Sequence, residues 1–171
     1  MATEIERKFL VHPDWPRPSS GTPLIQGYLT SGGPVSVRIR ASLDQAWLTI
    51  KGPTSGLSRA EFEYEIPILD ARQLLDLART QPIEKTRYLV PHGAHTFEVD
   101  VFVGSNTGLV VAEVELGAEN EEFDKPAWLA EEVSTDPRYR NSALAQHPYS
   151  TWPTPDGSTP DGSDEPELKE R

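Results

Sequence analysis

Ionisable side chains recur at two-residue intervals in several short stretches of the chain. The first stretch, Glu-Ile-Glu-Arg-Lys, places Glu4, Glu6 and Lys8 on one face of an extended strand, because alternate residues of a strand point the same way. The same spacing recurs in Arg38 and Arg40; Thr49 and Lys51; Glu61, Glu63 and Glu65; Lys85 and Arg87; Glu98 and Asp100; and Glu113 and Glu115. Such faces could bind ions or a charged ligand.

The residues between these charged positions are mostly apolar, as in Ile5 and Phe9 or Val37 and Ile39. For any single strand, the usual explanation is a sheet with one buried face and one solvent face. After the first strand, however, each charged face is sorted by sign, and neighbouring like charges repel unless something compensates them. Basic faces favour a polyanion, and acidic faces favour hard cations. Together they predict a phosphate chain bridged to carboxylates by Mg²⁺ or Mn²⁺.

Alternation of apolar and polar residues predicts eight strands, separated by turns rich in Gly, Pro, Ser and Asn. Two helices are also expected, one from Asp70 to about Arg79 with a capping-box-like start, and one from Asp136 through Ala145 with Pro at its first position. Many strands and few helices predict a mainly β (α+β) fold, either an antiparallel β-barrel or a highly curved sheet. The predicted strands are Glu4 to Val11, Leu24 to Thr30, Val35 to Ala41, Ala46 to Lys51, Ser58 to Pro67, Ile83 to Pro91, His95 to Phe102 and Val110 to Leu116.

The body of the chain and its C-terminal end differ in composition. Residues 1–152 are expected to form one domain. Residues 153–171 read PTPDGSTPDGSDEPELKER and are expected to form a disordered acidic tail, because so few apolar residues cannot offset the entropy lost on ordering. If the apolar faces of the strands point outward, helices and loops must cover them, and a homodimer interface could cover more.

Composition restricts the functions that this chain could have. The 171 residues carry a formal net charge of −11, which argues against nonspecific binding to nucleic acid or to an anionic membrane. There are no cysteines, so disulfides and Cys-ligated zinc are excluded. The charged N-terminus lacks the apolar run of a secretory signal, and no stretch approaches the roughly 20 apolar residues of a membrane span. We therefore expect a cytoplasmic protein.

Common nucleotide-binding and histidine-based sites are not predicted. The sequence contains neither a P-loop nor a Gly-x-Gly-x-x-Gly motif. The four histidines lack the spacing of metal ligands and are interpreted as structural or surface residues: His12, His92, His95 and His147.

The charged pairs resemble those of one known family. Glu4-Ile5-Glu6-Arg7-Lys8 is similar to the N-terminal E-x-E-x-K signature of the CYTH domain, or triphosphate tunnel metalloenzymes, and the later pairs follow in the family's order. The resemblance spans about residues 1–149. It is greatest to the small bacterial, tripolyphosphatase-like branch, which shares the Gln-Gly-Tyr-Leu stretch at Gln26 to Leu29 and a similar Leu-Ser-Arg run at Leu57 to Arg59. It implies an eight-stranded antiparallel barrel that forms a charged tunnel.

The resemblance also implies roles for the charged residues. Glu61 and Glu63 would bind a second metal, orient a nucleophilic water or hold the basic residues in place. One or two divalent cations, Mg²⁺ or Mn²⁺, would be held by Glu4, Glu6, Asp100, Glu113 and Glu115. The phosphates would be bound by Lys8, Arg38, Arg40, Lys51, Lys85 and Arg87, with Arg suited to bidentate contacts.

Two further features follow from the same resemblance. Tyr28 would pair with Lys8 and act as a base if Lys8 lowers its pKa, although a tyrosine that only hydrogen-bonds a neighbour inside the barrel is the alternative. The helix that begins at Asp136 resembles the family's C-terminal plug, in which Arg138 would reach into the tunnel.

The expected function is metal-dependent hydrolysis of inorganic triphosphate to pyrophosphate and phosphate. The substrate is expected to consist only of phosphate, since the sequence shows no motif for an adenine or thiamine pocket. Alternatives are an adenylate cyclase of the class IV type, another organic triphosphatase acting on nucleoside or thiamine triphosphate, a polyphosphate-binding module without turnover, and a purely structural β-domain.

Overall fold

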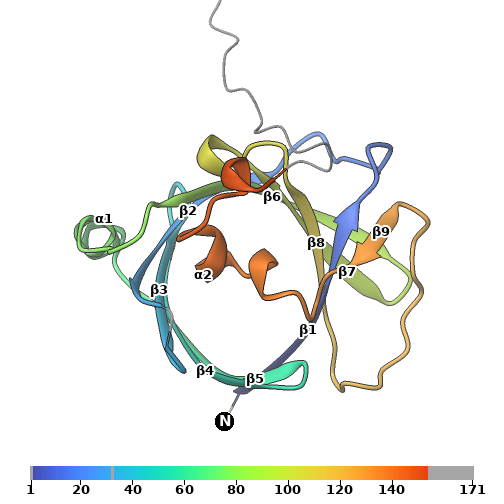
Figure 1. Ribbon diagram of the computed structural model, residues 1–171, viewed down its shortest axis with the longest axis horizontal. Coiled ribbons are helices and arrows are strands. Elements are labelled where there is room, and N and C mark those ends of the chain that lie inside the picture. Colours follow the sequence, from blue (N-terminus) through green and yellow to red (C-terminus); the bar gives the residue numbers. More distant parts are fainter. Residues whose placement is uncertain (1, 32, 154–171) are drawn as a thin grey trace, which may run out of the picture.

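The chain forms a closed antiparallel barrel in the computed structural model, which describes residues 2–31 and 33–153 (Figure 1). The strand order is β5-β4-β3-β2-β6-β7-β8-β1-β9, and an additional pairing of β5 with β1 closes the ring of eight strands. The predicted eight-stranded barrel is therefore confirmed. The strands are β1 (Ala2–Val11), β2 (Thr22–Thr30), β3 (Ser36–Ala41), β4 (Ala46–Ser55), β5 (Ser58–Glu65), β6 (Ile83–His92), β7 (His95–Phe102), β8 (Val110–Glu115) and β9 (Leu129–Glu132).

Strand β1 closes the barrel because it uses both of its edges. One edge pairs with β8 between Glu6 and Leu10. The other edge pairs with β5 over Ala2 to Ile5 and then with the short β9 over Phe9 to Val11. The sequence did not predict β9, since its four residues are too few for an alternating pattern to stand out.

The helices differ in detail from the sequence-based prediction. Helix α1 (Ile68–Asp76) begins before Asp70, and its N-cap is Pro67 without a side-chain hydrogen bond, so the predicted capping-box start is wrong. The predicted C-terminal helix is divided into a 3₁₀ turn, η2 (Pro137–Tyr139), and α2 (Asn141–Leu144), because Arg140 between them is extended at φ −69° and ψ 135°. Asp136 does cap η2, since its carboxylate accepts from the Arg138 N–H at 3.0 Å. Two more 3₁₀ turns are η1 (Gly104–Asn106) and η3 (Tyr149–Thr151).

The apolar faces of the strands point outward and are covered by other segments. The loop from β8 to β9 packs Phe123 and Trp128 against a buried cluster that includes Phe9 and Phe97. Helix α1 covers a second cluster, with Ala71 buried beside Ile39. Figure 1 shows α1 outside the ring of strands. The barrel is therefore apolar on the outside and charged within.

A third apolar cluster lies where the C-terminal segment meets the barrel. Leu144 of α2 is fully buried in the same cluster as Tyr28, Ile83 and Phe102. Figure 1 shows α2 and η2 drawn inside the ring of strands, whereas α1 lies outside it. The segment therefore has the position of a plug, as the sequence predicted.

Part of the outer surface of β5 stays open. Phe62 and Tyr64 are 41% and 55% exposed there. The homodimer expected from such apolar faces stays a prediction.

The predicted tail, residues 153–171, lies outside the described residues apart from Pro153. Among the described residues, no helix combines the length and apolar character that crossing a membrane requires.

The close approach of α1 to β2 depends on Gly27. A Cβ built on Gly27 would lie 2.9 Å from the Ala78 Cβ and 3.1 Å from the Leu75 Cδ2, so a side chain there must push the end of α1 away. We expect Gly27→Val to lower the free energy of unfolding by about 1–3 kcal/mol, measured by chemical denaturation. Gly33→Val is the control, because a Cβ at Gly33 meets nothing within 4 Å. Equal denaturation midpoints for the two variants would contradict this account of the packing.

Candidate active site

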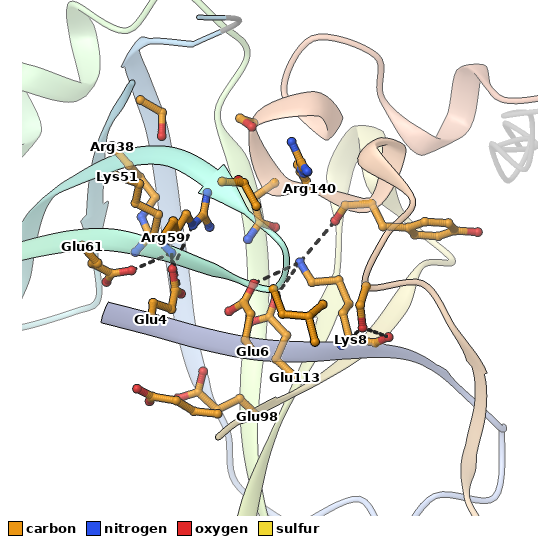
Figure 2. A pocket seen from close by; sticks show the side chains of 18 of the residues that line it. Glu4, Glu6, Lys8, Arg38, Lys51, Arg59, Glu61, Glu98, Glu113 and Arg140 are labelled. Atoms are coloured by element: carbon orange, nitrogen blue, oxygen red, sulfur yellow. Dashed lines mark hydrogen bonds and ion pairs between the residues drawn. The ribbon is translucent and has the colours of Figure 1, made fainter. Parts of the chain in front are cut away.

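The inner face of the barrel lines a cavity of about 740 Å³ (Figure 2). Its charged lining contains seven cationic and eight carboxylate side chains, so the cavity is almost balanced in formal charge. The cations are Lys8, Arg38, Arg40, Lys51, Arg59, Arg87 and Arg140, and the carboxylates are Glu4, Glu6, Glu61, Glu63, Glu98, Glu113, Glu115 and Asp136.

Strand register brings opposite charges together across the barrel wall. Lys8 of β1 lies opposite Glu113 of β8, and Glu4 lies opposite Arg59 of β5. Lys51 of β4 lies opposite Glu61. The sign sorting within single strands is thus compensated by neighbouring strands.

Glu4 joins two cations at one side of the cavity. Its carboxylate accepts from Lys51 Nζ at 2.7 and 2.8 Å and from Arg59 Nε at 3.0 Å. Lys51 also lies 2.8 Å from a Glu61 oxygen. The sequence had not identified Arg59, although it occupies the same strand face as Glu61, because the charged faces were read as sorted by sign.

Arg38 and Arg40 share Glu63 as their counter-charge. The guanidinium groups lie 3.5 and 3.2 Å from the Glu63 carboxylate, which also accepts from Thr49 Oγ1 at 2.8 Å. The Nε of each arginine is buried and has no hydrogen-bond partner among the described residues. Because both atoms are buried, an anionic ligand could reach these donors only after a local movement of the arginine side chains.

Lys8, Glu113 and Arg87 form a second charged group. Lys8 Nζ lies 2.7 Å from Glu113 Oε1, and Arg87 Nη2 lies 3.1 Å from Glu113 Oε2. Burial raises the pKa of Glu113, but Lys8 and Arg87 more than offset this and hold it well below its usual range. Burial lowers the pKa of Lys8, and Glu113 and Glu6 raise it above its ordinary value. Both groups are therefore charged at neutral pH.

Lys85 and Asp100 lie behind this group and do not line the cavity. Both side chains are 1% exposed, with Lys85 Nζ 2.5 Å from Asp100 Oδ2. Asp100 also accepts two hydrogen bonds of 2.7 Å from Arg87. The structure does not bring Lys85 and Asp100 into the cavity lining, so a phosphate-binding role for Lys85 and a metal-binding role for Asp100 stay predictions. Their observed contacts orient Arg87 towards the cavity, because the inner carboxylate fixes its guanidinium.

Glu6 has weak cationic support. Among the described residues its one ion pair is with Lys8, whose Nζ lies 3.9 Å away, which is too long for a hydrogen bond. Burial and the neighbouring Glu113 raise its pKa from 4.5 to about 7. Glu115, which pairs with Glu6 across β1 and β8, also lines the cavity. A cation beside Glu6 would relieve this accumulation of negative charge.

These carboxylates fit a divalent cation that is shared with a ligand. The described residues contain no group of three or more acidic or histidine side chains arranged to hold a metal by themselves. Mg²⁺ commonly uses one or two carboxylates, with waters and substrate phosphates as its other ligands. The donor set at Glu6 and Glu115 therefore suits Mg²⁺ or Mn²⁺ when phosphate oxygens complete the coordination.

Tyr28 lines the cavity and is 4% exposed. Its hydroxyl accepts from Gln26 Nε2 at 3.4 Å, and no hydrogen bond to Lys8 occurs among the described residues. Burial raises the pKa of Tyr28, against smaller opposing effects of Arg38 and Lys8. The phenol is therefore neutral at neutral pH, because the lowering of its pKa by Lys8 is smaller than the effect of burial.

The C-terminal segment contributes a different arginine from the one expected. Arg138 is 64% exposed, binds Asp136 at 2.6 Å and does not line the cavity, so its predicted entry into the tunnel is wrong. Arg140 lines the cavity instead. No sequence pattern pointed to Arg140, because it lies outside the alternating strands.

Comparison with known proteins agrees with this architecture. The chain is 45% identical over 154 residues to an inorganic triphosphatase of Acetivibrio thermocellus, covering 89% of this chain and 99% of that protein. It is 40% identical over 148 residues to an inorganic triphosphatase of Nitrosomonas europaea, covering 84% and 97%. A solved structure described as the inorganic triphosphatase NE1496 shares 37% identity with a TM-score of 0.61, covering 85% of this chain and 95% of that chain.

More distant structures share the fold alone. A putative adenylate cyclase from Bacillus halodurans is 16% identical with a TM-score of 0.55, covering 70% of this chain and 84% of that chain. The CYTH domain family matches residues 2–148, which include every strand of the barrel and all residues of the cavity lining. Because this match extends over nearly the whole chain, the protein belongs to the CYTH domain family.

Proposed function

We propose that the protein is an inorganic triphosphatase, which hydrolyses triphosphate to pyrophosphate and phosphate in a metal-dependent reaction. The observation that carries the proposal is the cavity itself, where cations from several strands converge inside a closed barrel and the buried Nε donors of Arg38 and Arg40 are unused. The relatives named inorganic triphosphatase, at 40–45% identity, support the same substrate.

The charge balance of the cavity supports a requirement for divalent metal. Its eight carboxylates already outnumber its seven cations, so a bound triphosphate would add uncompensated negative charge. Mg²⁺ or Mn²⁺ beside Glu6 and Glu115, with Glu4 and Glu113 nearby, would restore the balance. When bound, the metal would polarise phosphate oxygens and lower the pKa of a water.

The chain's own residues would bind and orient the phosphates. Lys8, Lys51 and Arg87 would exchange carboxylate oxygens for phosphate oxygens, which makes similar charge-assisted hydrogen bonds. Arg38 and Arg40 would add their unpaired Nε donors after a local movement of their side chains. These cations would stabilise the charge that develops on the leaving pyrophosphate oxygen. Glu61 and Glu63 hold Lys51 and the two arginines, which supports their role as orienting residues.

A substrate panel tests this function. With Mg²⁺ or Mn²⁺, we expect kcat/KM for phosphate release to be at least about tenfold higher for triphosphate than for ATP or thiamine triphosphate. Triphosphate consists only of phosphate groups, so all of the cavity cations can contact it. A preference for ATP, formation of cyclic AMP, or tight triphosphate binding without phosphate release would each contradict the proposal. Lys8→Met should lower kcat/KM about 10- to 100-fold, whereas Lys125→Met, which changes a lysine packed over the Phe9 ring, should not.

The raised pKa of Glu6 predicts how metal affinity depends on pH. Below about pH 7 the Glu6 carboxyl is protonated in the metal-free protein and must lose its proton to ligate a cation. We expect Mg²⁺ or Mn²⁺ affinity to rise up to about tenfold per pH unit between pH 5.5 and 7 and then to level off. Calorimetry in buffers of different ionisation enthalpy should detect the proton released at pH 6.5.

Glu6→Gln should abolish that proton release, and the exterior substitution Glu131→Gln should preserve it. Equal proton release from both variants would show that another group titrates.

Tyr28→Phe distinguishes a hydrogen-bond donor from a general base. Because burial keeps the phenol neutral, we expect the loss of its hydroxyl to lower kcat by only about tenfold, with the pH dependence of kcat unchanged. A loss of roughly 10²- to 10⁴-fold, together with disappearance of the basic-side dependence on pH, would identify Tyr28 as the base instead. Circular dichroism would verify that the variant is folded.

A further inference from the structure

Arg140 differs from every other cation that lines the cavity. The six barrel cations each have a carboxylate within ion-pairing distance. Among the described residues, Arg140 has no such partner, and its side chain is exposed. Its nearest acidic neighbour in sequence that lines the cavity, Asp136, is already bound by Arg138 through bonds of 2.6 to 3.1 Å.

Arg140 is also held at a fixed point above the strands. Figure 2 shows it entering from the C-terminal segment, on the opposite side of the view from the β1 strand that carries Glu4, Glu6 and Lys8. Its carbonyl accepts from the N–H groups of Ala143 and Leu144 at 2.9 Å, and Leu144 is buried. The neighbouring Tyr139 carbonyl accepts from Lys8 Nζ at 3.4 Å. The backbone is therefore anchored while the guanidinium stays free.

A free guanidinium and a paired one do not bind phosphate at equal cost. Lys8, Lys51 or Arg87 must first give up a carboxylate contact inside the barrel, which offsets much of the gain from the new one. Arg140 gives up only contacts with water. It can also offer two parallel N–H donors to one phosphoryl group.

We propose that Arg140 is a phosphate-capture residue, which binds the oxygens of the incoming polyphosphate directly and holds the chain against the barrel cations. The inference rests on the proposed function, since the ligand is the same triphosphate. Arg140 would contact the ligand equally in the ground state and in the transition state. It would therefore contribute to the affinity for triphosphate and not to kcat.

Arg138 provides a matched control for this proposal. Arg138→Gln and Arg140→Gln remove the same charge from the same segment, but only Arg140 lines the cavity. We expect Arg140→Gln to raise KM for triphosphate about 10- to 100-fold with kcat changed less than about threefold, and Arg138→Gln to leave both unchanged. Arg140→Lys, which keeps the charge but not the bidentate geometry, should fall between the wild type and Arg140→Gln.

Binding is measured separately with a non-hydrolysable imido analogue of triphosphate in the presence of Mg²⁺. Its Kd should rise with Arg140→Gln by the same factor as KM. Equal behaviour of Arg140→Gln and Arg138→Gln, or a fall in kcat at unchanged KM, would overturn the capture role. Failure of the wild type to hydrolyse triphosphate would instead overturn the proposed function, so the two failures are distinguishable.

Discussion

A buried cation needs a counter-charge, and this requirement organises the interior of the barrel. Removing an ammonium or guanidinium group from water costs several kcal/mol unless a carboxylate lies against it. Lys8 therefore lies against Glu113, Lys51 against Glu4, and Arg87 against Asp100. Closure of the sheet by β1 and β5 completes these pairs, since Glu4 meets Arg59 only across that seam. The closure that forms the ring of strands therefore also brings these ion pairs together.

The same pairs make the cavity ready to exchange ligands. A carboxylate that neutralises Lys8 or Lys51 in the free protein is chemically similar to a phosphate oxygen, so substitution of one for the other needs little rearrangement of the cation. The carboxylates released in this way are the hard oxygen ligands that Mg²⁺ or Mn²⁺ prefers. Phosphate and metal would therefore stabilise each other's binding, because each compensates the charge that the other leaves unpaired.

The sequence predicted the barrel and most of its lining because both depend on the two-residue repeat, which is local information. Thus Glu6, Arg38 and Glu113 lie where the alternation placed them. How far along the barrel a residue lies depends on the whole fold and cannot be read from the local repeat. Lys85 and Asp100 share the two-residue repeat of Arg87 and Glu98, and yet they lie behind the cavity. Arg59 was missed because it shares a strand face with Glu61 and Glu63, so that face was read as acidic. Arg140 was missed because its position depends on how α2 packs against the barrel.

An inverted barrel also links stability to the site. Because the strands direct their charged faces inward, their apolar faces need covers drawn from other parts of the chain. The C-terminal segment packs instead inside the barrel, where Leu144 contacts the apolar residues Ile83 and Phe102 on the inward faces of their strands. That segment also supplies the Tyr139 carbonyl to Lys8 and carries Arg140 into the lining. Packing that a fold of this kind needs for its own stability therefore positions a cation over the substrate cavity, and loosening that packing would affect ligand binding before it opened the barrel itself.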